Sequence, residues 1–232
     1  MHLLSVLQDS ELLDAGIDVK ASGWRDRLPI KRLDETSLVH RMFGGYFRSQ
    51  ILCNKCGHKS NTYDPFLDLA LEIDKKTITS VQSALKMFTK KETLDKHNMY
   101  KCSGCSKRVC AVKQLTVFRP PLVLCIQLKR FKYSSFGMRG GKVNKRVNFT
   151  SLMTLALSDT RVCEYTLTGV LVHVGGSVNS GHYYSYVKAV DGRWFEMDDS
   201  SVRRMREEDV VRQVQVAAAA EDVQEGGARR FG

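Results

Sequence analysis

Two neighbouring stretches of this 232-residue sequence decide its fold: Gly181-His182-Tyr183-Tyr184-Ser185-Tyr186-Val187-Lys188 and Trp194-Phe195-Glu196-Met197-Asp198-Asp199-Ser200. A histidine that follows a glycine, with a carboxylate a short distance downstream, has the form of a general base and the group that orients it. The carboxylate holds the imidazole in one tautomer and stabilises its charged form. Such a pair serves a nucleophile, so we expect a reactive thiol elsewhere in the fold.

The composition is that of a soluble globular protein, with 43% apolar and 26% charged residues. No apolar stretch reaches the length of a bilayer-spanning helix, so we expect no membrane partner. The first residues carry no basic region and meet Asp9 too early for a signal peptide. These features predict a cytoplasmic or nuclear protein.

The net charge is +11. It indicates either a solvated surface or an acidic or nucleic-acid neighbour. Aromatic residues do not interleave with the basic ones as they do on a base-stacking platform, which disfavours a nucleic-acid partner. The basic residues form two clusters along the sequence, one at Arg203, Arg204, Arg206 and Arg212 and one at Lys129, Arg130, Lys132, Arg139, Lys142, Lys145 and Arg146.

Hydrophobic periodicity and turn residues predict a mixture of strands and helices. Ser80 is a candidate N-cap for a helix with apolar residues at 81, 84, 85 and 88. Gly-rich and Ser-rich residues at 134–141 predict a mobile loop, and the Ala-rich residues 213–232 predict a disordered tail. The expected strands are 46–53, 67–73, the apolar run 122–126, 166–173 and 183–190, with a hairpin turn at Asp191-Gly192.

Seven cysteines, an odd number without a signal peptide, argue against a disulfide framework and favour metal binding. Two Cys-x-x-Cys pairs can complete a closed tetrahedral site of four thiolates, which would bind structural Zn²⁺. Four unrelated thiols are the alternative. Cys110 is a spare thiol near this site, and we interpret His58 as a surface residue rather than a ligand. The expected ligands are Cys53, Cys56, Cys102 and Cys105.

Together these motifs resemble the ubiquitin-specific proteases, cysteine deubiquitinases whose fold is described as thumb, palm and fingers. The resemblance covers roughly residues 38–210, and residues 64–69 are most similar to the branch that includes nucleolar deubiquitinases. It rests on four segments: Phe43-Gly44-Gly45-Tyr46 with the first cysteine pair, residues 122–131 ending in Leu128-Lys129-Arg130-Phe131, the histidine segment 167–188, and the terminal segment 194–202.

The resemblance implies an α+β papain-like fold, in which an antiparallel palm sheet carries the base and a zinc-binding fingers insertion spans about residues 46–118. The implied roles are a general base for His182 and an orienting group for Asp198, with Asp199 as a second polar partner. Which of the two aspartates orients the imidazole stays open, and the family's spacing from Trp194 favours Asp198. Gly181 would leave room for the narrow Gly-Gly tail of ubiquitin. Tyr183 and Tyr184 alternate faces of a strand, so that one lines the tail channel and the other packs inward.

The sequence departs from this family at its N-terminal end. The family's nucleophilic box, Gly-x-x-Cys-[Tyr/Phe]-x-Asn, has no counterpart, and Gln8-Asp9-Ser10-Glu11 is a faint echo of the next family segment. We expect Cys125 to be buried and inert and His173 to be structural. The interpretation is a palm and fingers at 38–212, after an unassigned segment 1–37, with most of the thumb missing.

Three hypotheses follow. The chain is a fragment of an active deubiquitinase that hydrolyses isopeptide or peptide bonds after the C-terminal Gly of ubiquitin, with ubiquitin and ubiquitinated proteins as partners. Alternatively, it is a catalytically inactive ubiquitin-binding module, or a zinc-stapled interaction module in which the His–Asp pair has no function. The nearest branch makes the nucleolus one candidate location.

Overall fold

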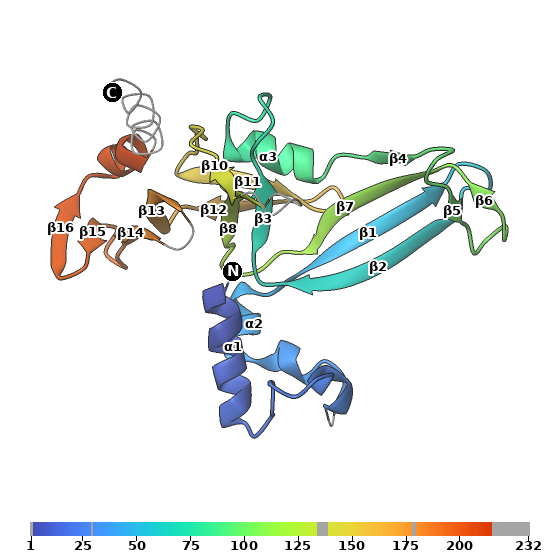
Figure 1. Cartoon of the computed structure of the whole chain (residues 1–232), viewed down its shortest axis with the longest axis horizontal. Helices are drawn as coiled ribbons and strands as arrows, with labels where there is room; N and C mark the ends of the chain where they lie inside the picture. The colour runs from blue at the N-terminus through green and yellow to red at the C-terminus, as the bar shows by residue number, and fades with distance from the viewer. Residues whose placement is uncertain (1, 29, 134–138, 178–179, 215–232) are drawn as a thin grey trace. The chain divides into compact units, whose positions relative to one another are not determined.

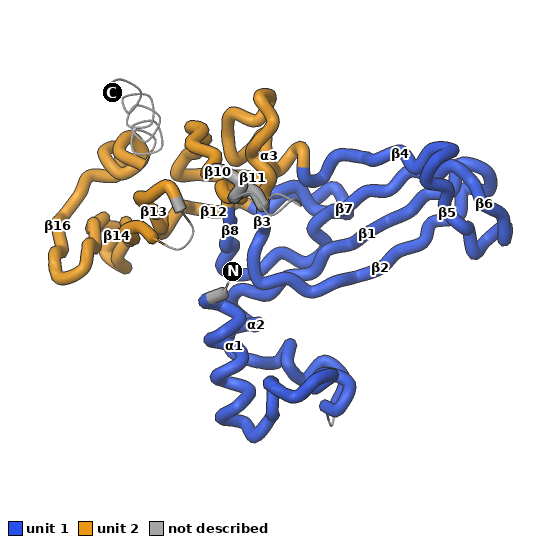
Figure 2. The backbone as a smooth tube through the Cα atoms, viewed as in Figure 1, with its two compact units in different colours: residues 1–70, 88–127, 155–163 blue, residues 71–87, 128–154, 164–232 orange. Residues whose placement is uncertain are grey.

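A computed structural model describes the whole chain except residues 1, 29, 134–138, 178–179 and 215–232. The described residues form two compact units, coloured separately in Figure 2. Unit 1 comprises Met1–Ala70, Phe88–Gln127 and Leu155–Cys163. Unit 2 comprises Leu71–Met87, Leu128–Thr154 and Glu164–Gly232. Each unit is therefore built from segments that are distant in sequence.

Unit 1 contains a four-stranded antiparallel sheet in the order β2-β1-β7-β4 (Figure 1). The expected strand 46–53 is confirmed as part of β1, which pairs with β2 from Gly45 opposite Phe66 to Leu52 opposite Lys59. A separate two-residue ladder joins β5 to β6 near the end of this sheet. The bounds are β1 Gly45–Cys53, β2 Lys59–Phe66, β4 Glu92–Leu94, β5 Tyr100–Lys101, β6 Arg108–Val109 and β7 Ala111–Arg119.

The N-terminal segment that the sequence leaves unassigned is held by hydrogen bonds in unit 1. The side-chain amide of Gln8, which is only 7% exposed, donates to the carbonyl of Asp34 at 2.8 Å and to the hydroxyl of Ser37 at 3.2 Å. The carboxylate of Glu11 accepts a hydrogen bond from the backbone N–H of Leu38. This N–H lies in the first turn of a helix, where backbone donors have no partner within the helix itself. The elements are α1 His2–Asp14, η1 Trp24–Arg27, η2 Leu33–Thr36 and α2 Leu38–Phe43.

Unit 2 contains an antiparallel meander in the order β13-β14-β15-β16. Side chains alternate between its two faces, and Tyr186 and Trp194 are buried on one face against Val210 of the helix at 207–214. This helix includes the first two residues of the expected tail, whose remainder lies outside the described residues. The bounds are β13 Gly169–Ser177, β14 Ser180–Lys188, β15 Trp194–Asp198 and β16 Ser201–Met205.

The remaining elements are short. The predicted N-cap of α3 is confirmed, because Ser80 Oγ accepts the backbone N–H of Ser83 at 3.1 Å. Part of the loop expected at 134–141 lies outside the described residues. In the described part of the chain, no helix is long and apolar enough to cross a bilayer. The bounds are α3 Val81–Phe88, β3 Leu69–Glu72, β8 Ile126–Lys129, β9 Phe131–Tyr133, β10 Arg139–Lys142, β11 Leu152–Ala156 and β12 Val162–Thr166.

The strand expected at 122–126 is wrong. Strand β8 begins only at Ile126, and Leu122 is 80% exposed. Pro120 and Pro121 lack backbone donors, and the N–H of Val123 bonds to the carbonyl of Met42 at 2.9 Å instead of to a sheet. Cys125 is consequently half-buried rather than fully buried.

The two expected C-terminal strands are confirmed with shifted ends. The run 166–173 is divided between the end of β12 and the start of β13, and the run 183–190 corresponds to β14, which ends at Lys188. The hairpin turn is confirmed, because Gly192 has φ of 83° and the Ala189 N–H bonds to the Arg193 carbonyl at 2.8 Å. These shifts leave the histidine and aspartate segments on adjacent strands.

Glu207 links the helix at 207–214 to two strands of the meander. Its carboxylate accepts hydrogen bonds from the ammonium of Lys188 at 3.0 Å and from the indole N–H of Trp194 at 3.2 Å. The hydroxyl of Ser151, then the ammonium of Lys188 and the indole of Trp194, lower the pKa of Glu207 from 4.5 to about 2. The helix is thereby held on the face that carries the core of unit 2.

The lowered pKa of Glu207 predicts a pH dependence of stability. The folded state favours the charged form of Glu207. Its contribution to the free energy of unfolding is therefore complete above pH 4.5 and is lost as the pH falls towards 2. We expect Glu207→Gln to lower the unfolding temperature near neutral pH and to reduce the difference from wild type in acid. Thermal unfolding from neutral to acidic pH measures this. If the unfolding temperatures of the two proteins differed by the same amount at every pH, the lowered pKa of Glu207 would be contradicted.

Candidate active site and metal centre

The register of β14 against β15 brings His182 to Asp198. Tyr186 pairs with Glu196 and Ser185 with Met197, so the last residue of β15 lies beside the first half of β14. Side chains two residues apart share a face of a strand, which puts the histidine and aspartate on the same side. His182 Nε2 makes a hydrogen bond to Asp198 Oδ1. Sequence reasoning left open which aspartate orients the histidine, and only Asp198 forms this contact in the described residues.

This contact is open to solvent. The side chains of His182 and Asp198 are 48% and 45% exposed, so water screens the attraction between them. The hydrogen bond that His182 donates to Asp198, the charge of Asp198 and then the charge of Asp199 raise the pKa of His182 above 6.5. The carboxylates therefore favour the imidazolium, which is the state that a general base reaches after it takes a proton.

Asp199 has a different role in the chain. It lies in the two-residue turn between β15 and β16, where Asp198 pairs with Ser201, and its φ of 49° is left-handed. Asp is one of the residues that tolerate this conformation. Its carboxylate belongs to one group with His182 and Asp198, in which the ligand atoms all lie within 4.8 Å of one another. It contributes charge to the site, whereas Asp198 contributes the direct contact.

Gly181 is required by its surroundings within the chain. Its φ is +156°, and a Cβ atom at this position would lie 2.2 Å from His173 Nε2 and 2.6 Å from the carbonyl oxygen of Val174. Gly175, on the neighbouring strand, has equally little space, because its Cβ would lie 2.8 Å from the Cα of Gly181. The two glycines therefore let β13 and β14 approach closely just before His182. The expectation that Gly181 leaves room for a substrate tail stays a prediction.

The two tyrosines lie where the alternation of β14 puts them, and His173, the other histidine of this sheet, lies opposite Tyr183 on β13. His173 packs against Tyr183, with ring centroids 4.5 Å apart, and against Phe131 at 5.7 Å. Tyr183 is 55% exposed, whereas Tyr184 packs inward against the core beside Tyr186. One tyrosine is thus available to a ligand and the other supports the sheet, as the alternation predicts.

Unit 2 contains no cysteine, since all seven belong to unit 1. Its His–Asp pair therefore has no thiol in its own unit. In unit 1, burial and the charge of Asp68 raise the pKa of Cys125, which disfavours its reactive thiolate. The expected inertness of Cys125 is supported, although its burial is only partial.

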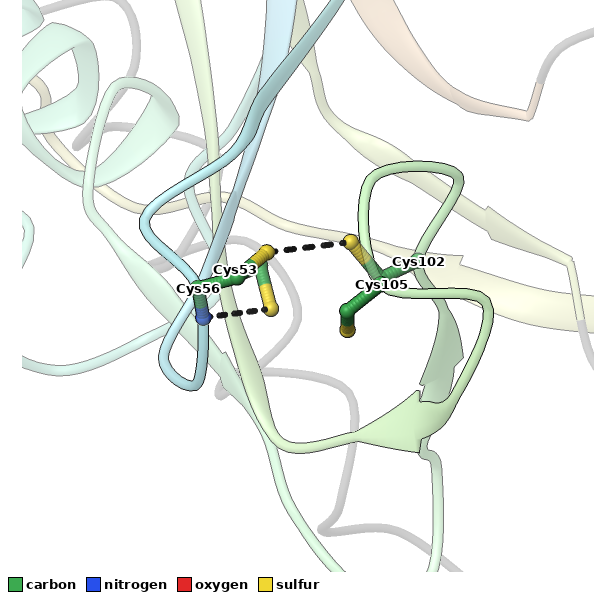
Figure 3. A group of neighbouring side chains, drawn as sticks. All are labelled: Cys53, Cys56, Cys102 and Cys105. Atoms are coloured by element: carbon green, nitrogen blue, oxygen red, sulfur yellow. Dashed lines mark hydrogen bonds between the residues drawn. The ribbon is translucent and has the colours of Figure 1, made fainter.

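The four expected metal ligands come together at the ends of unit 1 strands (Figure 3). Their sulfur atoms all lie within 4.8 Å of one another, and the sulfur atoms of Cys56 and Cys102 are 3.7 Å apart. With Zn–S bonds of about 2.3 Å, a tetrahedral site needs sulfur atoms about 3.8 Å apart. Two turns position the pairs, through bonds from Cys53 N–H to the His58 carbonyl and from Cys102 N–H to the Lys107 carbonyl.

The local backbone favours a thiolate at Cys53. At Cys56 a backbone bond from His58 is outweighed by the interaction with the Cys53 thiol and by burial, which raise the pKa of Cys56 to about 11. The N–H groups of Cys56 and Lys55 donate to Cys53 Sγ, each at 3.4 Å, and lower the pKa of the Cys53 thiol to about 7. Thiolate is the form that binds metal. His58 is not in the cluster and its Nε2 lies 3.1 Å from the hydroxyl of Ser103, as expected for a residue that is not a ligand. The donor set therefore fits a structural zinc ion.

Comparisons with known proteins agree with this arrangement. The family model for ubiquitin carboxyl-terminal hydrolase matches residues 7–223. A probable ubiquitin carboxyl-terminal hydrolase 16 of Schizosaccharomyces pombe is 45% identical over 171 residues, which is 72% of this chain and 36% of the relative. Ubiquitin carboxyl-terminal hydrolase 23 of Arabidopsis thaliana is 44% identical over 182 residues, 76% of this chain and 20% of the relative.

Solved structures show the same fold. A SAGA DUB module of Ubp8, Sgf11, Sus1 and Sgf73 bound to monoubiquitin has a TM-score of 0.67 and 33% identity, covering 81% of this chain and 42% of the matched chain. A related SAGA DUB module reaches a TM-score of 0.73 at 29% identity, covering 90% and 47%. The chain belongs to the ubiquitin carboxyl-terminal hydrolase family, with the catalytic-domain fold of ubiquitin-specific proteases. It spans 20–36% of the length of the curated relatives that it matches.

Sequence reasoning missed two residues that support the sheet of the His–Asp pair and one that holds the N-terminal segment. Gly175 makes room for Gly181, Glu207 anchors the helix at 207–214, and Gln8 holds α1. A signal existed for two of them: an acid in the first turn of a helix marks Glu207, and the faint family echo at Gln8 lies within the residues that the family model matches. The packing of Gly175 depends on the strand register and has no local signal.

The close packing at Gly181 predicts a large effect of a single methyl group. Gly181→Ala combines backbone strain with a clash, whereas Gly192→Ala, at φ of +83° with no atom within 4 Å of the added Cβ, introduces only strain. We expect about 1 kcal/mol of destabilisation for Gly192→Ala and about 3 kcal/mol for Gly181→Ala. Chemical denaturation measures both. Equal losses of stability in the two variants would show that the contact with His173 and Val174 does not constrain Gly181.

Proposed function

We propose that this chain supplies the general base and part of the ubiquitin-binding surface of a thiol deubiquitinase. The reaction is hydrolysis of the peptide or isopeptide bond after the C-terminal Gly of ubiquitin. The observation that supports it most is the contact between His182 and Asp198 in a chain of this family. Support for a ubiquitin partner comes from the neighbouring solved structure, which is bound to monoubiquitin.

In this proposal each ring nitrogen of His182 has its own task, and the contact with Asp198 supports the division. Nε2 is engaged by Asp198, so Nδ1 is the atom that receives the proton from a thiol. The thiolate then attacks the carbonyl carbon of the terminal Gly and forms a tetrahedral intermediate. The imidazolium returns its proton to the departing lysine amine, which leaves a thioester. Water, deprotonated by the same imidazole, hydrolyses the thioester and releases ubiquitin with a free carboxylate.

A second candidate is a ubiquitin-binding module without catalysis. The observation that favours it is the lack of any cysteine in unit 2. Both candidates require ubiquitin to bind, and they differ only in whether a nucleophile reaches His182. A cytoplasmic or nuclear location, the nucleolus included, stays a prediction.

Ubiquitin binding tests the surface that both candidates share. We expect the chain to bind ubiquitin, and we expect Tyr183→Ala to weaken binding by about tenfold, since exposed aromatic side chains commonly dominate an interface. Val190→Ala removes another exposed apolar side chain, at a turn, and is the matched control. Isothermal titration with ubiquitin provides the affinities. No binding of ubiquitin to the wild-type chain would refute both candidates.

The catalytic role requires a test in which a nucleophile is present. In a longer form of the protein that carries a reactive cysteine, His182→Ala should abolish hydrolysis of a fluorogenic ubiquitin amide and leave ubiquitin affinity within about twofold. Hydrolysis that persists at the wild-type rate would remove His182 from the mechanism. Loss of affinity together with hydrolysis would make it a binding residue instead.

We further propose that the four-cysteine cluster binds structural Zn²⁺. When bound, the metal supplies a cross-link between two turns distant in sequence, and it leaves no open position for catalysis. The thiolates of Cys53, Cys56, Cys102 and Cys105 would hold it, because these are the sulfur atoms that cluster.

Removing one thiol from the cluster should release the metal. We expect about one zinc per chain in wild type, near zero in Cys56→Ser, and a lower unfolding temperature for that variant. Cys110→Ser is the control, because Cys110 lies outside the cluster. Elemental analysis with thermal unfolding measures both properties. A Cys56→Ser protein that keeps its zinc and its stability would contradict the assignment.

A further inference from the structure

The end of unit 1 that carries the cysteine cluster is strongly basic. We call residues 53–59 and 96–108 the fingertip, which consists of the two cysteine turns with β5 and β6. These two segments contain six cationic side chains and no carboxylate. Asp95, just outside, uses Oδ1 to accept the backbone N–H of His97 at 2.9 Å. All six cations are exposed: Lys55, Lys59, Lys96, Lys101, Lys107 and Arg108.

These charges come together only in the fold. The two segments are separated by more than thirty residues in sequence, yet the sulfur atoms of their cysteines lie within 4.8 Å of one another. Five of the six cations lie within three residues of one of these cysteines in sequence. Four thiolates with one Zn²⁺ would carry two negative charges, which leaves the fingertip with a net charge of about +4. The patch is therefore basic with or without metal.

The fingertip cations lack acidic partners within the described part of the chain. None of the six takes part in an ion pair there. Lys101 and Arg108 are direct partners across the β5–β6 ladder, so two positive side chains lie opposite each other on one face. Like charges in this position destabilise a sheet. An anionic group bound between them would offset that repulsion.

The apolar groups of the fingertip distinguish between kinds of anion. Met99 is 41% exposed and stands between Lys96 and Lys101 in sequence. A phosphate backbone offers nothing for such a side chain to contact, whereas exposed methionine suits peptide binding. Tyr100, the only Phe, Tyr or Trp of these segments, packs against the buried cluster of Cys53, Cys102 and Val109. It is therefore not a free platform for stacking nucleic-acid bases.

We propose that the fingertip is a docking surface for an acidic peptide segment that carries an apolar residue among its carboxylates. The carboxylates bind the cations around the cysteine cluster, with Lys101 and Arg108 as a pair, and the apolar residue contacts Met99. The partner is a protein segment other than ubiquitin's tail, which the proposed function assigns to the His182 region of unit 2. The proposal does not depend on catalysis.

A defined peptide tests this surface directly. The probe is a fluorescein-labelled peptide of roughly 12 residues in which glutamate pairs alternate with single leucines. Fluorescence anisotropy with the full chain at low salt should show saturable binding that weakens as salt is added, because exposed charges are screened. A random-sequence DNA duplex of roughly 20 base pairs is the competing polyanion.

Three variants separate the contributions. Lys101→Ala with Arg108→Ala should weaken peptide binding by about fivefold and reduce its salt dependence. Met99→Ala should weaken it by about threefold and leave the salt dependence unchanged. Lys20→Ala with Lys31→Ala removes two exposed charges elsewhere in unit 1 and is the matched control, with no expected change. Zinc content and unfolding temperature establish that each variant is folded.

Several outcomes would overturn the proposal. Equal losses in the fingertip and control variants would show that only the net charge matters. Tighter binding of the duplex than of the peptide would make the fingertip a nucleic-acid surface. A parallel loss of ubiquitin affinity in the Lys101→Ala, Arg108→Ala variant would assign the fingertip to the ubiquitin site. Failure of ubiquitin to bind the wild-type chain would leave the peptide result unaffected, so the two proposals fail separately.

Discussion

The antiparallel pairing of β14 with β15 is the constraint on which the candidate active site depends. One residue of slip would move His182 to the opposite face of the sheet from Asp198. Two features fix this register: Tyr186 and Trp194 are buried on the core face, and Glu207 bonds to Trp194 on that face. On the other side of β14, Gly181 permits the close approach of β13. The His182–Asp198 pair itself is exposed and contributes little to stability, so the sheet positions the pair and not the reverse.

The cysteine cluster has the corresponding role in unit 1. Its sheet is long and narrow, and the β5–β6 ladder at its end contains only two residues on each strand, too few to be stable without support. Four thiols on two turns provide that support once they bind a metal. The fold that brings the two cysteine turns together also gathers basic side chains from distant segments. The four-cysteine cluster therefore lies in a charged surface, which the linear sequence does not display as a cluster.

The sequence was sufficient wherever a short motif carries its own chemistry. The Gly-His segment, the two cysteine pairs and the cap at Ser80 occur in the structure as their patterns predict. The prediction from the sequence was wrong at residues 122–126, where an apolar run was interpreted as a buried strand although Pro120-Pro121 precedes it. The fingertip was also missed, because the basic clusters at 129–146 and 203–212 are contiguous in sequence whereas the fingertip forms by folding. Packing of glycines and like-charge pairs across strands depend on register, which single-sequence patterns do not define.

The most direct test of this account is the titration of His182 by nuclear magnetic resonance in wild type and in Asp198→Asn. If the two side chains make the contact that the sheet register predicts, the pKa of His182 lies above 6.5 in wild type, because the carboxylate stabilises the imidazolium. Replacing the carboxylate by an amide of the same shape should then lower it. A His182 pKa that is the same in both proteins would contradict the pairing, and with it the proposal that this chain carries the base of a thiol protease.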